Sequence, residues 1–230
     1  MRTLREYYED LKRIQDEIWS SIDVQGRVII DVGVGESTKR LIELGADIVA
    51  IDISLSKIEE YRYVKDDVLD FVQCDITKPP FRIKSLDLVV FYFTLHEINP
   101  LKHQDIIKNL GNITHYVMIV EPSPIGEPLY NKFAQIWKEA MHSVGKFEDY
   151  KPLEYWKKLL NECSFTVIKT RIIKWRKRIP YLILKELISE TCNEWEKLGV
   201  DEKHLNDLKN ILEDAEERGG MYWSDIYMVL

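Results

Sequence analysis

The chain has 230 residues, of which 45% are hydrophobic, so it is long enough to bury a large core within one domain. Its formal net charge of −7 argues against general attraction to nucleic acid or to an anionic membrane surface. Three widely spaced cysteines exclude a metal knuckle and argue against a disulfide framework, and no long apolar run or cleavable leader is present, so we expect a soluble, cytoplasmic protein without a metal.

The first element is a predicted N-terminal helix over residues 1–20. Apolar side chains recur at helical spacing from residue 3 onward, with Tyr7, Tyr8 and Leu11 on one face. Such a pattern favours a helix that packs this face against the edge of a sheet.

Residues 27–54 have the pattern of one β-α-β unit. A β-branched run predicts a buried parallel strand, and Gly33 and Gly35 follow it in a sharp turn. The next residues predict a helix and then a second strand that ends on Asp52. Such a unit binds a nucleoside-bearing ligand, because the helix N-terminus receives an anionic group and the acid accepts hydrogen bonds from ribose hydroxyls.

Strands and helices then alternate as far as residue 165. This alternation predicts a parallel sheet with helices on both faces. We expect helices at 54–65, 100–110 and 152–163, and strands at 71–74, 86–93, 115–120, 165–175 and 221–230.

Two stretches interrupt the alternation. Residues 126–150 place Tyr130, Phe133 and Trp137 at helical spacing, which is consistent either with core packing or with a lid over an acceptor pocket. Residues 177–220 hold an apolar helix followed by an acidic one, and separate the last two strands by far more than a hairpin needs.

A basic segment precedes the second insertion. It could bind RNA phosphates, or it could pair with the acidic helix, and the acidity of the whole chain favours pairing. Its charged residues are Lys169, Arg171, Lys174, Arg176, Lys177 and Arg178.

The glycine turn resembles motif I of the class I S-adenosylmethionine-dependent methyltransferases, an acid followed by x-Gly-x-Gly-x-Gly. Here Asp31 is the acid and Ser37 stands at the third glycine, whereas Thr38 does not fit the last position of a dinucleotide fingerprint. Asp31, Asp52 and Asp75 are placed at the ends of successive strands. Residues 86–98 resemble the fourth-strand motif of the family, which leads into a Leu-His turn beside the methyl group.

This resemblance, to the UbiE-like small-molecule methyltransferases, covers most of the first 165 residues. It implies one domain over 1–230 with a Rossmann-like, doubly wound α/β fold. In that fold a mostly parallel seven-stranded sheet has an antiparallel last strand. The insertions at 126–150 and 177–220 would form a helical substrate lid.

The resemblance and the chemistry of S-adenosylmethionine assign a role to each candidate residue. Asp31 would accept a hydrogen bond from the ammonium, directly or through water, and Asp52 would bind the ribose diol. The residues expected to bind the cofactor are Asp31, Gly33, Gly35, Glu36, Ser37, Asp52, Ile53, Asp75, Ile76 and Phe93. Those expected near the acceptor are Tyr8, Tyr92, His96, Glu97, Tyr130 and Trp137.

The predicted reaction is in-line transfer of a methyl group to a small molecule, leaving S-adenosylhomocysteine. His96 is the candidate general base, although its residue type slightly favours the alternative of a turn residue that satisfies backbone groups. Three alternatives stay open: an RNA or protein methyltransferase that uses 169–178, a nicotinamide-dependent oxidoreductase, and a nucleoside-binding module without catalysis. The sequence does not name the acceptor atom or the oligomeric state, and we expect no membrane partner.

Overall fold

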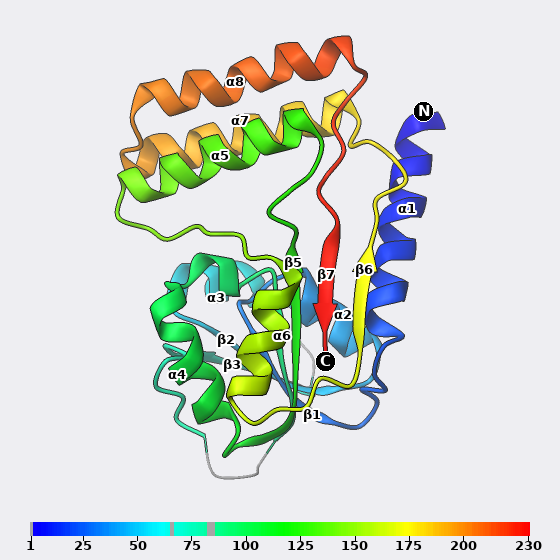
Figure 1. Ribbon diagram of the computed structural model, residues 1–230, viewed down its shortest axis with the longest axis vertical. Helices are drawn as coiled ribbons and strands as arrows, with labels where there is room; N and C mark the ends of the chain where they lie inside the picture. The colour runs from blue at the N-terminus through cyan, green and yellow to red at the C-terminus, as the bar shows by residue number, and fades with distance from the viewer. Residues whose placement is uncertain (1, 65–66, 82–85) are drawn as a thin grey trace. The chain divides into compact units, whose positions relative to one another are not determined.

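A computed structural model describes residues 2–64, 67–81 and 86–230 (Figure 1). The strands are β1 (Val28–Val32), β2 (Asp47–Asp52), β3 (Leu69–Gln73), β4 (Leu86–Tyr92), β5 (Thr114–Pro122), β6 (Thr170–Ile173) and β7 (Ile226–Val229). The helices are α1 (Arg2–Trp19), α2 (Glu36–Glu43), α3 (Leu55–Tyr61), the short 3-10 turn η1 (Leu95–Glu97), α4 (Pro100–Leu110), α5 (Pro128–Ser143), α6 (Leu153–Glu162), α7 (Tyr181–Leu198) and α8 (Glu202–Glu217).

The strands form one seven-stranded sheet in the order β3-β2-β1-β4-β5-β7-β6. β1 pairs in parallel with β2 and β4, β2 with β3, and β4 with β5, so the carboxyl ends of all five strands meet at one edge. At the end of β7, Leu230 exchanges backbone hydrogen bonds with Lys169 just before β6, which is the pattern of antiparallel neighbours. The predicted fold, mostly parallel with an antiparallel last strand, is confirmed.

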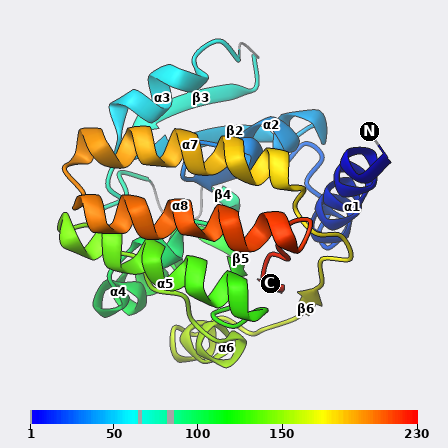
Figure 2. The same ribbon diagram turned by 90° about the horizontal axis from the view of Figure 1, so that it is seen from above.

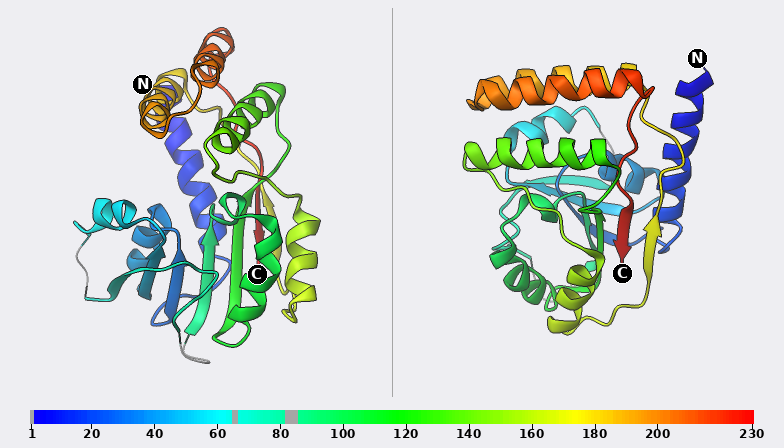
Figure 3. Two further views of the ribbon diagram at one scale, coloured as in Figure 1. Left: turned by 90° about the vertical axis from the view of Figure 1, so that its left-hand side faces the viewer. Right: turned by 45° about the horizontal axis from the view of Figure 1, so that its top comes forward.

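The chain divides into two compact units. The sheet unit comprises Ser20–Glu121, Pro152–Arg171 and Tyr227–Leu230, and the helical unit comprises Met1–Trp19, Pro122–Lys151 and Ile172–Ile226. Within the sheet unit α2 and α3 cover one face of the sheet, and α4 and α6 cover the other (Figure 3). The β-branched strands pack between these layers, as a parallel sheet requires.

The helical unit has a separate core. α8 lies between α5 and α7 (Figure 2), and the apolar faces of these helices meet around Phe133, Leu184 and Leu208. Among the described helices, none has both the length and the apolar character that a membrane crossing needs.

Several boundaries differ from the sequence prediction. The helix expected at 54–65 ends at Tyr61, and its expected last residue, Lys65, lies outside the described residues. The strand expected over 165–175 is confined to β6, and the one expected over 221–230 to β7.

The basic segment leaves the sheet after β6 because α1 binds its backbone. Asp10 Oδ2 accepts hydrogen bonds from the amides of Arg176 (2.6 Å) and Lys177 (2.9 Å). Arg13 donates to the carbonyl of Lys174, and the Lys177 ammonium pairs with Glu6. Residues 174–177 of the basic segment therefore bind α1, whereas the sequence pattern favoured the acidic helix; only Arg178 reaches carbonyls at the end of that helix and just after it.

We expect Asp10→Ala to lower the free energy of unfolding by about 2 kcal/mol, because the side chain is buried and its loss leaves two backbone amides without their acceptor. Urea denaturation followed by circular dichroism measures this. Glu9→Ala on the same helix is the matched control, since its ion pair with Arg5 is exposed and should contribute less than 1 kcal/mol. Equal effects of the two substitutions would contradict the anchoring role of Asp10.

Candidate functional site

The candidate site lies in the sheet unit, at the edge where the parallel strands end. Loops that follow β1, β2, β4 and β5 meet there because the strands run in one direction. In open α/β sheets ligands bind outside this edge. Three acids, the glycine turn and one histidine shape this edge. The acids are Asp31, Asp52 and Glu121, and the histidine is His96. Each lies at the end of a strand or in the turn that follows one.

Asp31 fixes the beginning of α2. Its carboxylate is fully buried and accepts hydrogen bonds from the hydroxyls of Ser37 (2.9 and 3.0 Å) and Thr38 (2.6 Å). Burial raises the pKa of Asp31 to about 7, although the hydroxyl bonds lower it in part. The predicted acid of the motif is therefore a buried group whose oxygens are held by the turn that follows it.

Gly33 has φ +90°, a backbone conformation that other residues rarely adopt. Its amide donates to the carbonyl of Ile51, and a Cβ at this position would lie 2.7 Å from Thr94 Oγ1. Gly33 is therefore required both by its conformation and by the close approach of the loop after β4. Gly35, which precedes α2, has an extended backbone with free space around it.

Asp52 ends β2 and joins two loops. Its Oδ2 accepts from the amide of Val34 in the glycine turn (3.1 Å), and its Oδ1 accepts from the amide of Ser54 before α3 (2.8 Å). The carboxylate is partly exposed and offers further acceptor positions on each oxygen. It is thus oriented by backbone groups and still accessible.

The other residues predicted on the cofactor side lie at the same edge but differ in exposure. Glu36 begins α2 and binds the ammonium of Lys39. Ile53 is exposed, and Ile76 is buried. Asp75 is exposed beyond the end of β3, and the hydrogen bond from the amide of Thr77 lowers its pKa.

Two aromatic residues mark the end of β4, Tyr92 as its last residue and Phe93 directly after it. Burial raises the pKa of Tyr92 to about 12, with smaller contributions from the negative charges of Asp31 and Glu36. Phe93 has φ +53°, a left-handed backbone conformation that is costly for a residue with a side chain. Its ring packs edge to face against that of Tyr92, with 4.6 Å between the ring centroids. The amide of Phe93 donates to the carbonyl of Val120 on β5, which holds this strained residue in place.

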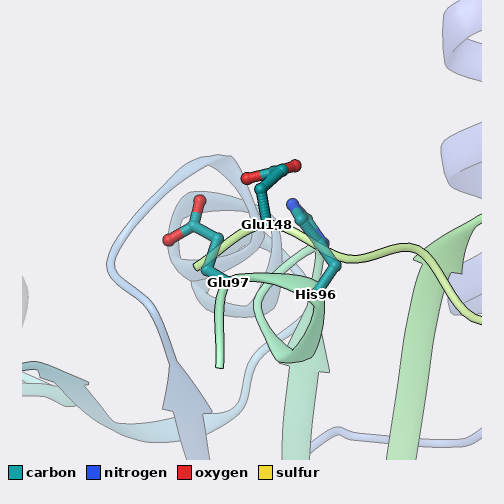
Figure 4. A group of neighbouring side chains, drawn as sticks. All are labelled: His96, Glu97 and Glu148. Atoms are coloured by element: carbon teal, nitrogen blue, oxygen red, sulfur yellow. The ribbon is translucent and has the colours of Figure 1, made fainter. Parts of the chain in front are cut away.

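His96 lies on the turn η1, next to Glu97 (Figure 4). A buried acid at the end of β5 holds this turn. Oε1 of Glu121 accepts from the amides of Thr94 (3.0 Å) and Leu95 (2.6 Å), and Oε2 lies 2.6 Å from His96 Nδ1. His96 itself is therefore bound through its ring to a carboxylate, beyond the turn-stabilising role that the sequence also allowed.

A second histidine secures the other end of the turn. Nε2 of the fully buried His103 lies 3.0 Å from the carbonyl of Leu95 and 2.9 Å from that of Ile98, and Nδ1 lies 2.9 Å from the hydroxyl of Tyr155. Since carbonyls only accept, His103 carries its proton on Nε2. The turn that holds His96 is thus bound at both ends.

Three of the residues expected near the acceptor belong to the helical unit. Tyr8 is exposed on α1 and meets Tyr7 edge to face. Tyr130 is buried, and burial raises its pKa to about 12. Trp137 packs against Trp195 in the core of that unit.

Comparison with known proteins now adds to this geometry. Residues 30–114 match the family model described as a methyltransferase domain. The chain is 35% identical over 81 residues to a demethylmenaquinone methyltransferase of Renibacterium salmoninarum, and 32% identical over 135 residues to one of Clavibacter sepedonicus. The matched segments make up 34% and 51% of this chain, and the chain spans only 34% and 55% of the length of these two relatives.

Residues 30–114 of the chain are thus similar to a methyltransferase domain. Solved structures agree on the fold. An S-adenosylmethionine-dependent methyltransferase from Archaeoglobus fulgidus has a TM-score of 0.60 at 15% identity, with 96% of this chain and 92% of the other covered. One from Mesorhizobium loti has a TM-score of 0.58 at 13% identity, with 93% and 96% covered.

Sequence reasoning missed two residues that shape the candidate site. Thr38 was considered only as a mismatch to a dinucleotide fingerprint, although a hydroxyl one residue after Ser37 is a natural donor to Asp31. Glu121 directly follows the strand expected at 115–120 and was given no role. An acid that follows a run of buried apolar residues is a signal, because burial obliges it to find donors.

The raised pKa of Asp31 predicts a pH dependence of the stability of this protein. An unfolded aspartate titrates near about 3.9, so between about pH 4 and about pH 7 the folded state binds more protons than the unfolded state. The contribution of Asp31 to the free energy of unfolding should therefore fall as pH rises, by up to about 1.4 kcal/mol per pH unit. Urea denaturation of the wild type and of Asp31→Asn across this pH range isolates the contribution of Asp31. The difference between their free energies of unfolding should change steadily with pH. Parallel curves would contradict the prediction.

Proposed function

We propose that the protein transfers a methyl group from S-adenosylmethionine to a small molecule, leaving S-adenosylhomocysteine. The observation that carries the proposal is Asp52, an accessible carboxylate fixed by the amides of Val34 and Ser54 beside a glycine turn that opens a helix. A carboxylate in this position suits a ribose diol, and the turn suits a carboxylate at the helix N-terminus. The family match over residues 30–114 supports the same ligand.

The cofactor residues have distinct proposed roles. Asp31, directly or through water, would interact with the ammonium, and its raised pKa means that a nearby positive charge would stabilise the ionised form. Asp75 would bind the adenine amino group, with Ile76 supplying a backbone amide. The remaining contacts would come from Gly33, Gly35, Glu36, Ser37, Ile53 and Phe93.

When bound, S-adenosylmethionine supplies a methyl group on a positively charged sulfur. The residues of the chain then have to align the acceptor and exclude water, and alignment alone can supply much of the rate. Tyr92 and Phe93 would provide an aromatic wall, whose faces attract a cation. His96 would act as a base only where the acceptor carries a proton.

A small acceptor is favoured over RNA. Lys169, Lys177 and Arg178 of the basic segment already bind groups of the chain, namely the Ser21 carbonyl, Glu6, and carbonyls after α8. Two similar proteins are named for methylation of demethylmenaquinone, itself a small molecule. The proposal also includes a single domain in which the helices of 126–150 and 177–220 form a substrate lid. Tyr8, Tyr130 and Trp137 would then lie near the acceptor, together with Glu97. A cytoplasmic location is also part of the proposal.

Asp52→Asn should weaken S-adenosylmethionine binding about 10-fold to 100-fold, because an amide cannot accept from two hydroxyls as a carboxylate does. Asp47→Asn is the matched control, since Asp47 begins the same strand and so lies at the opposite edge of the sheet. Isothermal titration calorimetry with S-adenosylmethionine and S-adenosylhomocysteine measures both affinities.

Two results would overturn the proposal. One is wild-type protein that binds neither compound at millimolar concentration but binds a nicotinamide dinucleotide. The other is an equal loss of affinity in Asp52→Asn and Asp47→Asn. Binding of S-adenosylmethionine without transfer of a radiolabelled methyl group to any fraction of a cell extract would favour a binding module over an enzyme.

A further inference from the structure

Thr38 is a buried residue on the first turn of α2, and its hydroxyl has two partners. The amide of Gly35 can only donate, so Oγ1 of Thr38 accepts in that 3.3 Å contact. The hydroxyl proton is therefore available for Asp31, whose ionised Oδ2 accepts it at 2.6 Å. One side chain thus links the buried acid of β1 to the backbone of the glycine turn.

The backbone of Thr38 binds the same glycine. Its amide donates to the carbonyl of Gly35 at 3.1 Å, so the two residues are joined reciprocally, as in a capping box. A glycine at the N-cap has no side chain that could accept from the first amides of the helix. Thr38 therefore fixes both polar backbone groups of Gly35, the residue at which the glycine turn becomes a helix.

The neighbouring side chains make only one half of this connection. Ser37 donates to both oxygens of Asp31, at 2.9 and 3.0 Å, and Asp52 accepts from the amide of Val34 in the glycine turn. Among the side chains that the structure describes, Thr38 is the one that binds both the acid and the turn.

We propose that Thr38 is a positioning residue for the amino-acid end of S-adenosylmethionine. This inference rests on the proposed function, in which Asp31 interacts with the ammonium and the glycine turn receives the carboxylate. Both of these groups belong to one end of the cofactor, and Thr38 holds together the two parts of the chain that face them. The ribose and the adenine are assigned to Asp52 and Asp75. Loss of the Thr38 hydroxyl should therefore weaken only ligands that carry the amino-acid end.

The first test is isothermal titration calorimetry with two probes: S-adenosylhomocysteine, which has the amino-acid end, and 5′-methylthioadenosine, which lacks it. Thr38→Val keeps the shape of the side chain and removes the hydroxyl. It should weaken S-adenosylhomocysteine binding about 10-fold, as expected for one lost hydrogen bond, and change the affinity for 5′-methylthioadenosine little. Thr38→Ser restores the hydroxyl and should bind both probes as the wild type does.

Thr114→Val is the matched control. Thr114 is also a buried threonine, and it begins β5, so it lies at the opposite edge of the sheet. Its hydroxyl donates to the carbonyl of Tyr116. Loss of that hydroxyl can lower the melting temperature, but it should leave both affinities unchanged. A lower melting temperature by itself would therefore not account for a selective loss of affinity in Thr38→Val.

The second test needs no ligand. Hydrogen exchange followed by NMR should show the Gly35 amide protected about 10-fold or more in the wild type and in Thr38→Ser, because the hydroxyl accepts its hydrogen bond. In Thr38→Val this protection should be lost.

Each outcome decides a separate point. An unprotected Gly35 amide in the wild type would overturn the contact itself. Equal weakening of both probes in Thr38→Val, or undiminished affinity for S-adenosylhomocysteine, would overturn the positioning role. Should Thr38→Val not fold, exchange in the wild type decides the role instead: S-adenosylhomocysteine should increase the protection of Gly35, and no change would refute it.

The proposed function can fail separately. Wild-type protein that binds neither S-adenosylmethionine nor S-adenosylhomocysteine would refute it and would overturn the role of Thr38 in cofactor binding. The exchange result would then still show whether Thr38 holds the glycine turn.

Discussion

The edge of the sheet is organised by acids that have to find hydrogen-bond donors. Asp31, Asp52 and Glu121 each stand at or next to the last residue of a strand, where the chain turns away from the sheet. The Asp31 carboxylate accepts hydrogen bonds from hydroxyls at the beginning of α2. The Asp52 carboxylate accepts from one amide of the glycine turn and from the amide of the residue before α3. Glu121 accepts from an amide of η1 and contacts the ring of His96 on the same turn. An unpaired buried carboxylate would cost several kcal/mol, so each acid stabilises one conformation of the loop that it faces. The same groups that stabilise the fold thereby determine the geometry of the candidate site.

Much of this edge could be predicted because its determinants are local in sequence. The β-branched run before Gly33 and the acid at the end of β2 define a β-α-β unit within about thirty residues, a length typical of the motif. Strand and turn preferences act over the same short range, so most element positions were predicted within a few residues. What they did not predict is how Asp31 is used. A strand-ending acid could as well face solvent, and only the hydroxyls of Ser37 and Thr38, buried on the first turn of α2, turn it inward.

The features that sequence reasoning missed depend on contacts between distant segments. Glu121 and His96 are 25 residues apart, and their pairing follows from the adjacency of β4 and β5 rather than from any local pattern. The long strand expected over 165–175 failed for a related reason. Its residues have strand propensity, yet Asp10 and Arg13, more than 160 positions earlier, bind the backbone from Lys174 to Lys177 and remove it from the sheet. Propensity says which residues can pair in a ladder, but competing partners decide which of them do.

Strain and burial are concentrated where the proposed chemistry would take place. Phe93 has a left-handed backbone conformation between β4 and η1. Gly33 has φ +90°, and a Cβ at this position would lie 2.7 Å from Thr94 Oγ1. The pKa of Asp31 is raised to about 7. The left-handed conformation of Phe93 costs of the order of 1–3 kcal/mol in the protein alone, and burial of the Asp31 carboxylate also costs free energy, whereas glycine adopts a positive φ without strain. Such costs persist only where surrounding contacts hold the geometry in place. Two hydrogen bonds provide these contacts here, one from the amide of Phe93 to the carbonyl of Val120 and one from the hydroxyl of Thr94 to the carbonyl of Val32. Because Thr94 contacts the glycine turn through its side chain and Glu121 through its amide, a ligand that shifts the turn would also shift the residue that precedes η1. Thr94 therefore connects the glycine turn with the turn that carries His96.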